Sequence, residues 1–171
     1  PKACYEMTVR IINRAMEWLD EKTEGKAVFG GQKVKALDAD ARNAVAQKLM
    51  PVIRGMISAT ERKAGHFDDS AAVLEFVGSH RLEELAALGT SCPDHFLRTK
   101  IRPLVVDFDP ANPDIYATIA GLPQAVSDYR DGYAAYYDQC KHANSPAIRD
   151  PNAVVYLVPG VGMITFAKDK A

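Results

Sequence analysis

Features that mark membrane, secreted and nucleic-acid-binding proteins are missing from this sequence. No apolar run approaches the roughly 20 residues that cross a bilayer, and no signal peptide is visible. The 21 Lys and Arg residues are interspersed with 22 Asp and Glu residues, so there is no basic stripe for nucleic acid. Cys4, Cys92 and Cys140 are far apart and form no CxxC pair, which is typical of reduced thiols. We therefore expect a cytoplasmic protein with no membrane or nucleic-acid partner.

Standard catalytic and cofactor-binding motifs are also missing. The four histidines have no HxH or HExxH spacing, and neither GxSxG nor a P-loop occurs. Gly160 and Gly162 follow an apolar run, but a dinucleotide-binding fingerprint requires a third glycine and a helix at that point. The β-rich run "MITFA" follows instead, so these glycines predict a hairpin turn. We expect no cofactor-binding site within the segment.

What the sequence does contain is a series of helical patterns. Apolar residues recur at three- and four-residue spacing in several stretches, which predicts helices. These stretches are residues 3–22, 38–56, 70–78, 81–89 and 112–142. Pro51 predicts a kink or a break in the second helix, and Gly121 with Pro123 predicts a break in the last.

Short β-rich runs lie among the later helices. "PLVVDF", "AVVYLV" and "MITFA" predict strands, and the last two form a C-terminal β-hairpin. A chain of 171 residues is long enough to bury one sizeable core. We therefore predict an α/β fold, a single layered domain over residues 1–171 in which several helices pack a small mixed sheet. An α+β arrangement is the alternative.

One segment, "TSCPDHFLRTK" at residues 90–100, gathers groups that can bind a ligand. Pro93 suits the first position of a helix, where the N–H groups of the first turn stay free, and the Thr90 and Ser91 hydroxyls lie beside them. Arg98 and Lys100 follow one or two turns later. This arrangement suits a phosphate or a carboxylate.

His95 is the candidate catalytic residue of the same segment. An imidazole can act as an acid, a base or a metal ligand near neutral pH. The alternative is a plain charged helix face, in which Asp94 pairs with Arg98 at i, i+4. The residues alone leave both interpretations open.

A weaker candidate is a metal site around "HFDDS". His66 and Asp68 can hold a hard cation, and His95 is a further candidate ligand. The alternative is structural, because Asp68 and Asp69 also suit the N-terminus of a helix that Ser70 caps.

The segment "TSCPDHFLRTKIRPL" resembles the Thr-Pro-Asp-His…Arg-Thr-Lys segment of the bacterial bifunctional enzymes that join a class II rhamnulose-1-phosphate aldolase to a short-chain (lactaldehyde/alcohol) dehydrogenase. "ACYEMTVRIINRAMEWL" is similar to the helix that follows the metal-binding His-Gly strand in the aldolase half. "VVYLVPGVGMITFAKDKA" is similar to the strand pair before the dehydrogenase half. The resemblance implies that residues 1–171 are a fragment between an aldolase core and a dehydrogenase domain, in an enzyme of deoxysugar (rhamnose-type) catabolism.

The same resemblance implies that both catalytic sets lie elsewhere. The zinc ligands of the aldolase would precede Pro1, and the glycine-rich loop and Tyr-x-x-x-Lys of the dehydrogenase would follow Ala171. Val161 stands where the similar His-Gly strand has a ligand. The segment alone is expected to be inactive, whereas the parent enzyme is expected to use zinc and NAD and to form a homo-oligomer.

Two functions are therefore considered. In the first, the segment links the aldolase and dehydrogenase domains, and His95, Arg98 or Lys100 reaches the substrate phosphate or the metal of the aldolase site. In the second, it is a non-catalytic scaffold or oligomerisation module. Its interfaces would be the apolar first helix and the tyrosines of residues 129–137.

Overall fold

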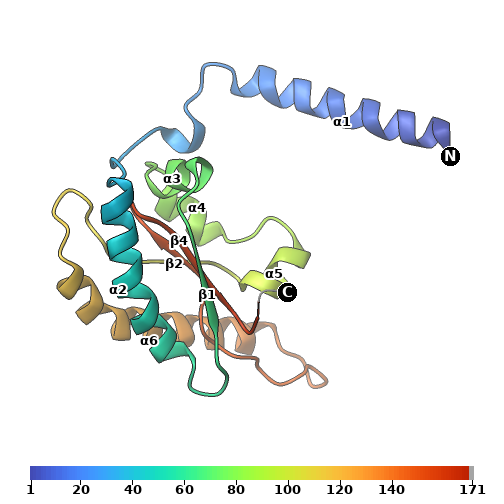
Figure 1. Ribbon diagram of the computed structural model, residues 1–171. Helices are drawn as coiled ribbons and strands as arrows, with labels where there is room; N and C mark the ends of the chain where they lie inside the picture. Colours follow the sequence, from blue (N-terminus) through green and yellow to red (C-terminus); the bar gives the residue numbers. More distant parts are fainter. Residues whose placement is uncertain (170–171) are drawn as a thin grey trace.

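The sheet at the centre of the fold has four strands in the order β1–β4–β3–β2 (Figure 1). The computed structural model describes residues 1–169, apart from the Pro93 side chain. β1 (Ala64–Asp68) and β3 (Val155–Val158) pair antiparallel with β4 (Gly162–Ala167), whereas β2 (Leu104–Val105) runs parallel to β3. The predicted mixed sheet and C-terminal hairpin are confirmed.

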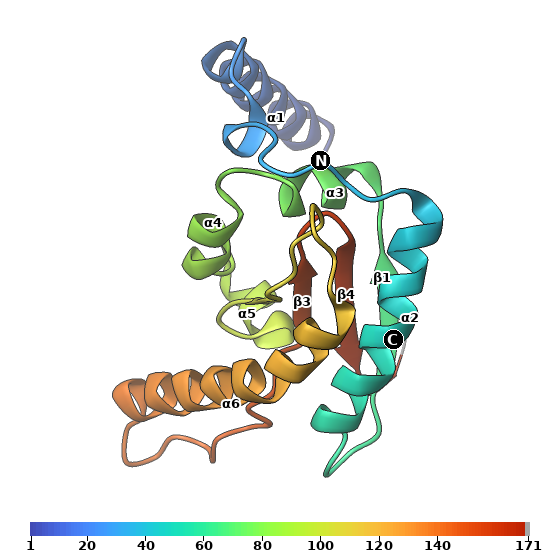
Figure 2. The same cartoon turned by 90° about the vertical axis from the view of Figure 1, so that its left-hand side faces the viewer.

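Alternate side chains of the strands project to opposite faces of the sheet, so each face has its own core. Tyr156 and Ile164 belong to one buried cluster, and the neighbouring Leu157 belongs to the other. The flanking helices are α2 (Ala39–Ile57) and α6 (Ile115–Cys140) on the first face, and α3 (Ala71–Val77) and α4 (Leu82–Leu88) on the second. The sheet thus lies between two layers of helices (Figure 2), which confirms the predicted α/β class.

Glycines end the two short helices, as the sequence predicts. Gly78 follows the last residue of α3, and Gly89 follows the last residue of α4 with φ +75°. A Cβ atom at Gly89 would lie 1.9 Å from the carbonyl oxygen of Ile101. The chain therefore needs glycine there both for its backbone angle and for the close approach.

Neither long helix is broken at its proline, so the break predicted at Gly121 and Pro123 is wrong, and of the kink or break predicted at Pro51 the break does not occur. α2 continues through Pro51, and α6 continues through Gly121 and Pro123. A proline removes one helical hydrogen bond. Around Pro51 this loss is offset by packing, because Leu49 and Ile53 on either side of it are fully buried in the same core cluster.

Helix caps differ from the prediction in two places. The Ser70 side chain makes no capping hydrogen bond to α3; instead its N–H donates to Asp68 Oδ1 at 2.9 Å. α6 begins after Asp114, whose Oδ1 accepts two N–H groups of the first turn, and not at Asn112.

Helix α1 (Lys2–Thr23) stands away from the three layers (Figures 1 and 2). None of its residues is buried. Cys4 is exposed on this helix, and Cys140 is exposed at the end of α6. Within residues 1–169, no helix combines the length and the apolar character that a membrane span requires.

The chain between α1 and α2 lies against the layered part of the molecule. It contains a short 3-10 turn, η1 (Val28–Gly30), and its Phe29 ring packs edge-on against Phe76 with 5.1 Å between the ring centroids. The N–H of Leu37 donates to the Gly160 carbonyl oxygen at 2.9 Å. Among the helices and strands of residues 1–169, α1 is therefore the one that stands apart from the sheet and its flanking helices.

Candidate functional site

The predicted phosphate-binding segment forms α5 (Pro93–Thr99) and the loop before it. The N-cap residue is Cys92, and no side chain caps the helix. Thr90 and Ser91 line a cavity of about 480 Å³, which Arg102 also lines. Thr90 and Ser91 therefore line one cavity, but the basic residue that lines it with them is Arg102 and not Arg98 or Lys100.

Lys100 is turned into the fold. Its ammonium group donates a hydrogen bond to the carbonyl oxygen of Asp150 and lies 4.8 Å from the centroid of the Tyr133 ring. Burial lowers the pKa of Lys100, and the Asp150 carboxylate partly offsets this shift. The structure does not bring Lys100 to the cavity that Thr90 and Ser91 line.

His95 and Arg98 are exposed on α5. Neither side chain makes a hydrogen bond or an ion pair to another of the residues that the structure describes, and no salt bridge joins Asp94 to Arg98 there. The ion pair between Asp94 and Arg98 that the alternative interpretation expects is therefore absent from the described residues. Both side chains are free to reach a group outside this chain.

The predicted metal ligands do not gather into one site. His66 and Asp68 lie two residues apart on β1, whereas His95 lies on α5. The N–H of Ser70 donates to the Asp68 carboxylate, and this bond lowers the pKa of Asp68 below its ordinary value. Nowhere in residues 1–169 do three His, Cys, Asp or Glu side chains come together as a metal site would require. The residues present do not fit a bound zinc ion.

The glycines of the β3–β4 turn do not fit the pyrophosphate group of NAD either. The turn that contains Gly160 leads from β3 directly into β4. A pyrophosphate group binds where free N–H groups of a helix N-terminus follow such glycines. We therefore assign these residues no chemistry that involves zinc or NAD.

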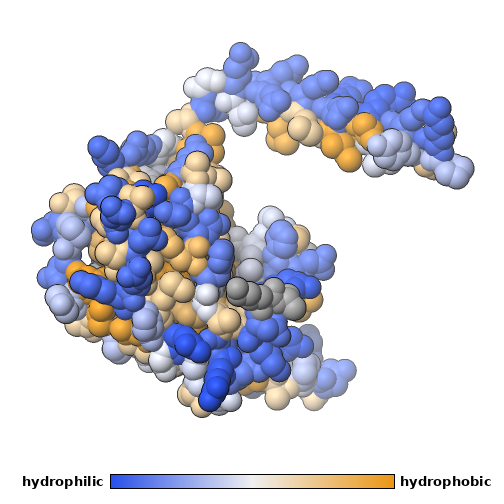
Figure 3. Space-filling view, in the orientation of Figure 1, coloured by the Kyte–Doolittle hydropathy of each residue, from blue (hydrophilic) through white to orange (hydrophobic). Residues whose placement is uncertain are grey.

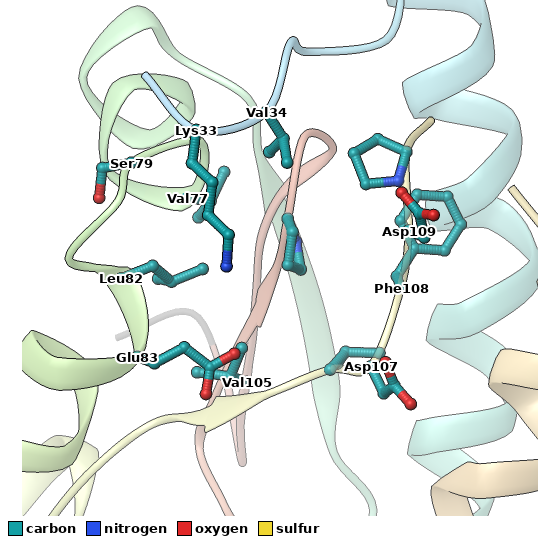
Figure 4. Close-up of a pocket in the computed structure, with 13 residues that line it drawn as sticks. Lys33, Val34, Val77, Ser79, Leu82, Glu83, Val105, Asp107, Phe108 and Asp109 are labelled. Carbon is teal, nitrogen blue, oxygen red and sulfur yellow. The ribbon is translucent and has the colours of Figure 1, made fainter. Parts of the chain in front are cut away.

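A cavity that the sequence did not indicate opens at the carboxyl ends of the parallel strands β2 and β3 (Figure 4). Its volume is about 430 Å³. Asp107 and Asp109 follow β2, Pro159 follows β3, and all three line it. Gly160 makes the adjoining turn with φ +68°, and a Cβ atom there would lie 2.8 Å from Cβ of Pro110. In open α/β sheets, ligands bind at this end of parallel strands.

Lys33 and Glu83 bring opposite charges into this cavity. Figure 4 shows their side chains pointing toward one another, Lys33 from the chain before α2 and Glu83 from α4. No ion pair within residues 1–169 includes either of them. With Asp107 and Asp109, one cation and three carboxylates give the lining a net charge of −2. Such a lining suits a hydroxyl-rich or cationic small molecule better than a phosphate.

The lining residues come from separate parts of the sequence, so no motif could reveal the cavity. One signal was available. Asp107 and Asp109 directly follow the apolar run of β2, and acidic side chains at the end of a parallel strand are candidate ligand contacts. No pattern in the sequence predicts a role for Ser79. It lines the cavity and is buried, and its hydroxyl has no hydrogen-bond partner in the described part of the chain.

These features define a mixed α/β domain with an exposed helix, a cavity beside α5 and another at the carboxyl ends of β2 and β3. Residues 44–171 match the family described as aldolase class II, second domain, and the chain belongs to this family.

The chain is also similar to a protein named uncharacterized oxidoreductase YuxG, from Bacillus subtilis (strain 168). The two are 31% identical over 170 residues, which is 99% of this chain and 24% of that protein. The chain thus spans about a quarter of the length of this relative. No solved structure matches the chain.

Proposed function

We propose that this chain is the connecting second domain of a sugar-phosphate aldolase of class II, in a polypeptide that also carries an NAD-dependent short-chain dehydrogenase. The observation that carries the proposal is a combination of two similarities. The chain belongs to an aldolase family, and it spans only a quarter of a relative whose name describes an oxidoreductase. One polypeptide with both activities accounts for both similarities.

In this proposal the domain contributes to the aldolase site through α5. The side chains of His95 and Arg98 are exposed and have no hydrogen-bond or ion-pair partner within residues 1–169. Arg98 would bind the substrate phosphate, because a guanidinium group forms paired, charge-assisted hydrogen bonds with phosphate oxygens. Zinc and NAD would be held by the other domains. The domain alone would have neither activity.

The test uses the product of the complete reading frame. Arg98→Ala should raise KM for the sugar phosphate at least tenfold, because a hydrogen bond to a charged group contributes about 1.5–3 kcal/mol. His95→Ala should lower the rate of aldol cleavage. Arg62→Ala and His142→Ala are the matched controls, since both side chains are exposed and neither has a partner among residues 1–169. Near-normal kinetics in both α5 variants would contradict the proposed contact with the substrate.

A second candidate function, a non-catalytic scaffold or oligomerisation module, is favoured by the exposed apolar side chains of α1. If this function includes self-association, light scattering of residues 1–171 should show a mass above that of the monomer. A strict monomer at high concentration would argue against it.

A further inference from the structure

The strongest unexplained feature of the structure is the apolar surface of α1. Its large apolar side chains are 36–72% exposed. They are Tyr5, Met7, Val9, Ile11, Ile12, Met16, Trp18 and Leu19. In Figure 3, apolar side chains lie along the side of α1 that faces the open space beside the rest of the chain.

The apolar surface of α1 is too wide for one contact. At about 100° per residue, these side chains cover roughly 200° of the helix circumference, interrupted by Thr8. A helix on the surface of a domain buries a stripe of about 100° or somewhat more. A helix whose apolar surface is twice as wide is buried on two sides, as it would be inside a domain. A pair of helices from two copies would leave much of this surface in water.

The charges of α1 also indicate that packing must stabilise it. The first turn of α1 contains no acidic residue, and its last turn contains one base, Lys22. The helix macrodipole is therefore not stabilised at the start of α1 and is stabilised by a single base at its end. Only one ion pair, Lys2 with Glu6, forms along α1 within the described residues. The helix therefore depends on tertiary contacts that this chain does not supply.

The similarities to known proteins indicate which domain supplies those contacts. The match to the second domain of class II aldolases begins at residue 44, after α1 and inside α2. The similarity to the Bacillus subtilis relative covers 99% of the chain and so includes α1. We infer that α1 docks with its apolar surface into the first domain of the class II aldolase. This inference rests on the proposed function, because it requires that domain in the same enzyme.

The chain after α1 fixes where the docked domain would lie. The N–H groups of His80 and Arg81 donate to the carbonyl oxygens of Gly31 and Phe29, at 3.0 and 3.2 Å. Lys33, in the same stretch, lines the cavity at the ends of β2 and β3. The first domain would therefore lie on the α3–α4 side, near that cavity, and ligand sites are common at such domain junctions.

Cys4 provides a direct test, because it lies on the apolar surface of α1 and Cys140 provides an internal control. Both thiols are exposed in this chain. Maleimide labelling, read by peptide mass spectrometry, is compared between residues 1–171 and the product of the complete reading frame. Cys4 should react at least tenfold more slowly in the complete product, whereas Cys140 should react at a similar rate in both. Equal rates for Cys4 would overturn the inference.

Two variants and one dilution series complete the test. Ile11→Asp should restore fast labelling of Cys4 in the complete product, whereas Asn13→Asp, which adds the same group to the polar side of α1, should not. Protection of Cys4 in residues 1–171 that increases with concentration would assign the surface to a second copy and overturn the inference. The wild-type comparison stands even if Ile11→Asp fails to fold.

Aldol cleavage is measured separately, so the two proposals can fail separately. Cleavage of a sugar phosphate by a complete product whose Cys4 stays reactive would contradict only the docking of α1. A protected Cys4 in a product that cleaves no sugar phosphate would contradict only the proposed function.

Discussion

The ammonium group of Lys100 lies 4.8 Å from the centroid of the Tyr133 ring, so a cation at the end of α5 rests on an aromatic face of α6. The same group donates a hydrogen bond to the Asp150 carbonyl oxygen, in the loop before β3. Lys100 also has φ +69°, which is uncommon for a residue other than glycine. One side chain thus joins three segments, and α5 depends on it for its position.

Replacing this cation should destabilise the fold. Lys100→Met keeps the apolar stem but loses the cation–π contact and the hydrogen bond, so we expect the free energy of unfolding to fall by about 2 kcal/mol. Urea denaturation measures this change. Tyr133→Phe is the control, because it keeps the aromatic face and should change stability by less than about 0.5 kcal/mol. A Lys100→Met protein as stable as the wild type would show that the contact is energetically neutral.

Two buried tyrosines should respond oppositely to the loss of a hydroxyl. Tyr156 is fully buried, and its hydroxyl has no hydrogen-bond partner in the described part of the chain. Tyr156→Phe should therefore raise the free energy of unfolding by about 1 kcal/mol. The Tyr129 hydroxyl donates to the Arg102 carbonyl oxygen at 2.8 Å, so Tyr129→Phe should lower it by about 1 kcal/mol. Thermal and urea unfolding measure both variants. Changes of the same sign in the free energy of unfolding would contradict the prediction.

Features that depend on neighbouring residues could be predicted from the sequence. Gly89 ends α4 because the backbone angle that it adopts is set locally, and the strands on either side of Gly160 form a hairpin for the same reason. The break predicted at Gly121 and Pro123 is wrong, because a proline alone does not decide whether a helix ends. Whether α2 continues through Pro51 depends on burial of Leu49 and Ile53 against distant strands, which local patterns do not reveal.

The candidate site was predictable only in part, for the same reason. The start of α5 at Pro93 follows from proline geometry, and it was found. The inward turn of Lys100 depends on Tyr133 and Asp150, which lie far along the chain. The cavity at β2 and β3 likewise forms only when the parallel strands pair.

Substitution of two glycines by alanine should change the free energy of unfolding in opposite directions. At Gly89, a new Cβ would collide with the Ile101 carbonyl oxygen at 1.9 Å, in a backbone conformation that alanine resists. Gly89→Ala should therefore lower the free energy of unfolding by about 3 kcal/mol or more. Gly55 lies inside α2, and a Cβ atom there would have no neighbour within 4 Å, so Gly55→Ala should raise it by about 0.5–1 kcal/mol. A stable Gly89→Ala protein would contradict the tight turn after α4.

Asp150 should make stability depend on pH in the acid range. Burial alone would raise the pKa of its carboxyl group, but the N–H of Asn152 at 2.9 Å and the ammonium of Lys63 at 3.1 Å bring it below its usual value of 3.8. A carboxyl group with a lowered pKa in the folded state binds protons less readily there than in the unfolded chain. Its contribution is therefore present above about pH 4 and is lost as the pH falls through the folded-state pKa.

Asp150→Asn tests this dependence, because it removes the titrating group and keeps its size. Between about pH 5 and pH 2, the free energy of unfolding should fall less steeply in this variant than in the wild type, by up to about 1 kcal/mol in total, since the pair is partly exposed. Asp131→Asn is the control, because Asp131 is exposed and has no ion pair within residues 1–169. Urea denaturation at a series of pH values gives the slopes. If Asp150→Asn and the wild type lose stability in parallel below pH 4, the contacts of Asp150 with Lys63 and Asn152 do not stabilise its ionised form.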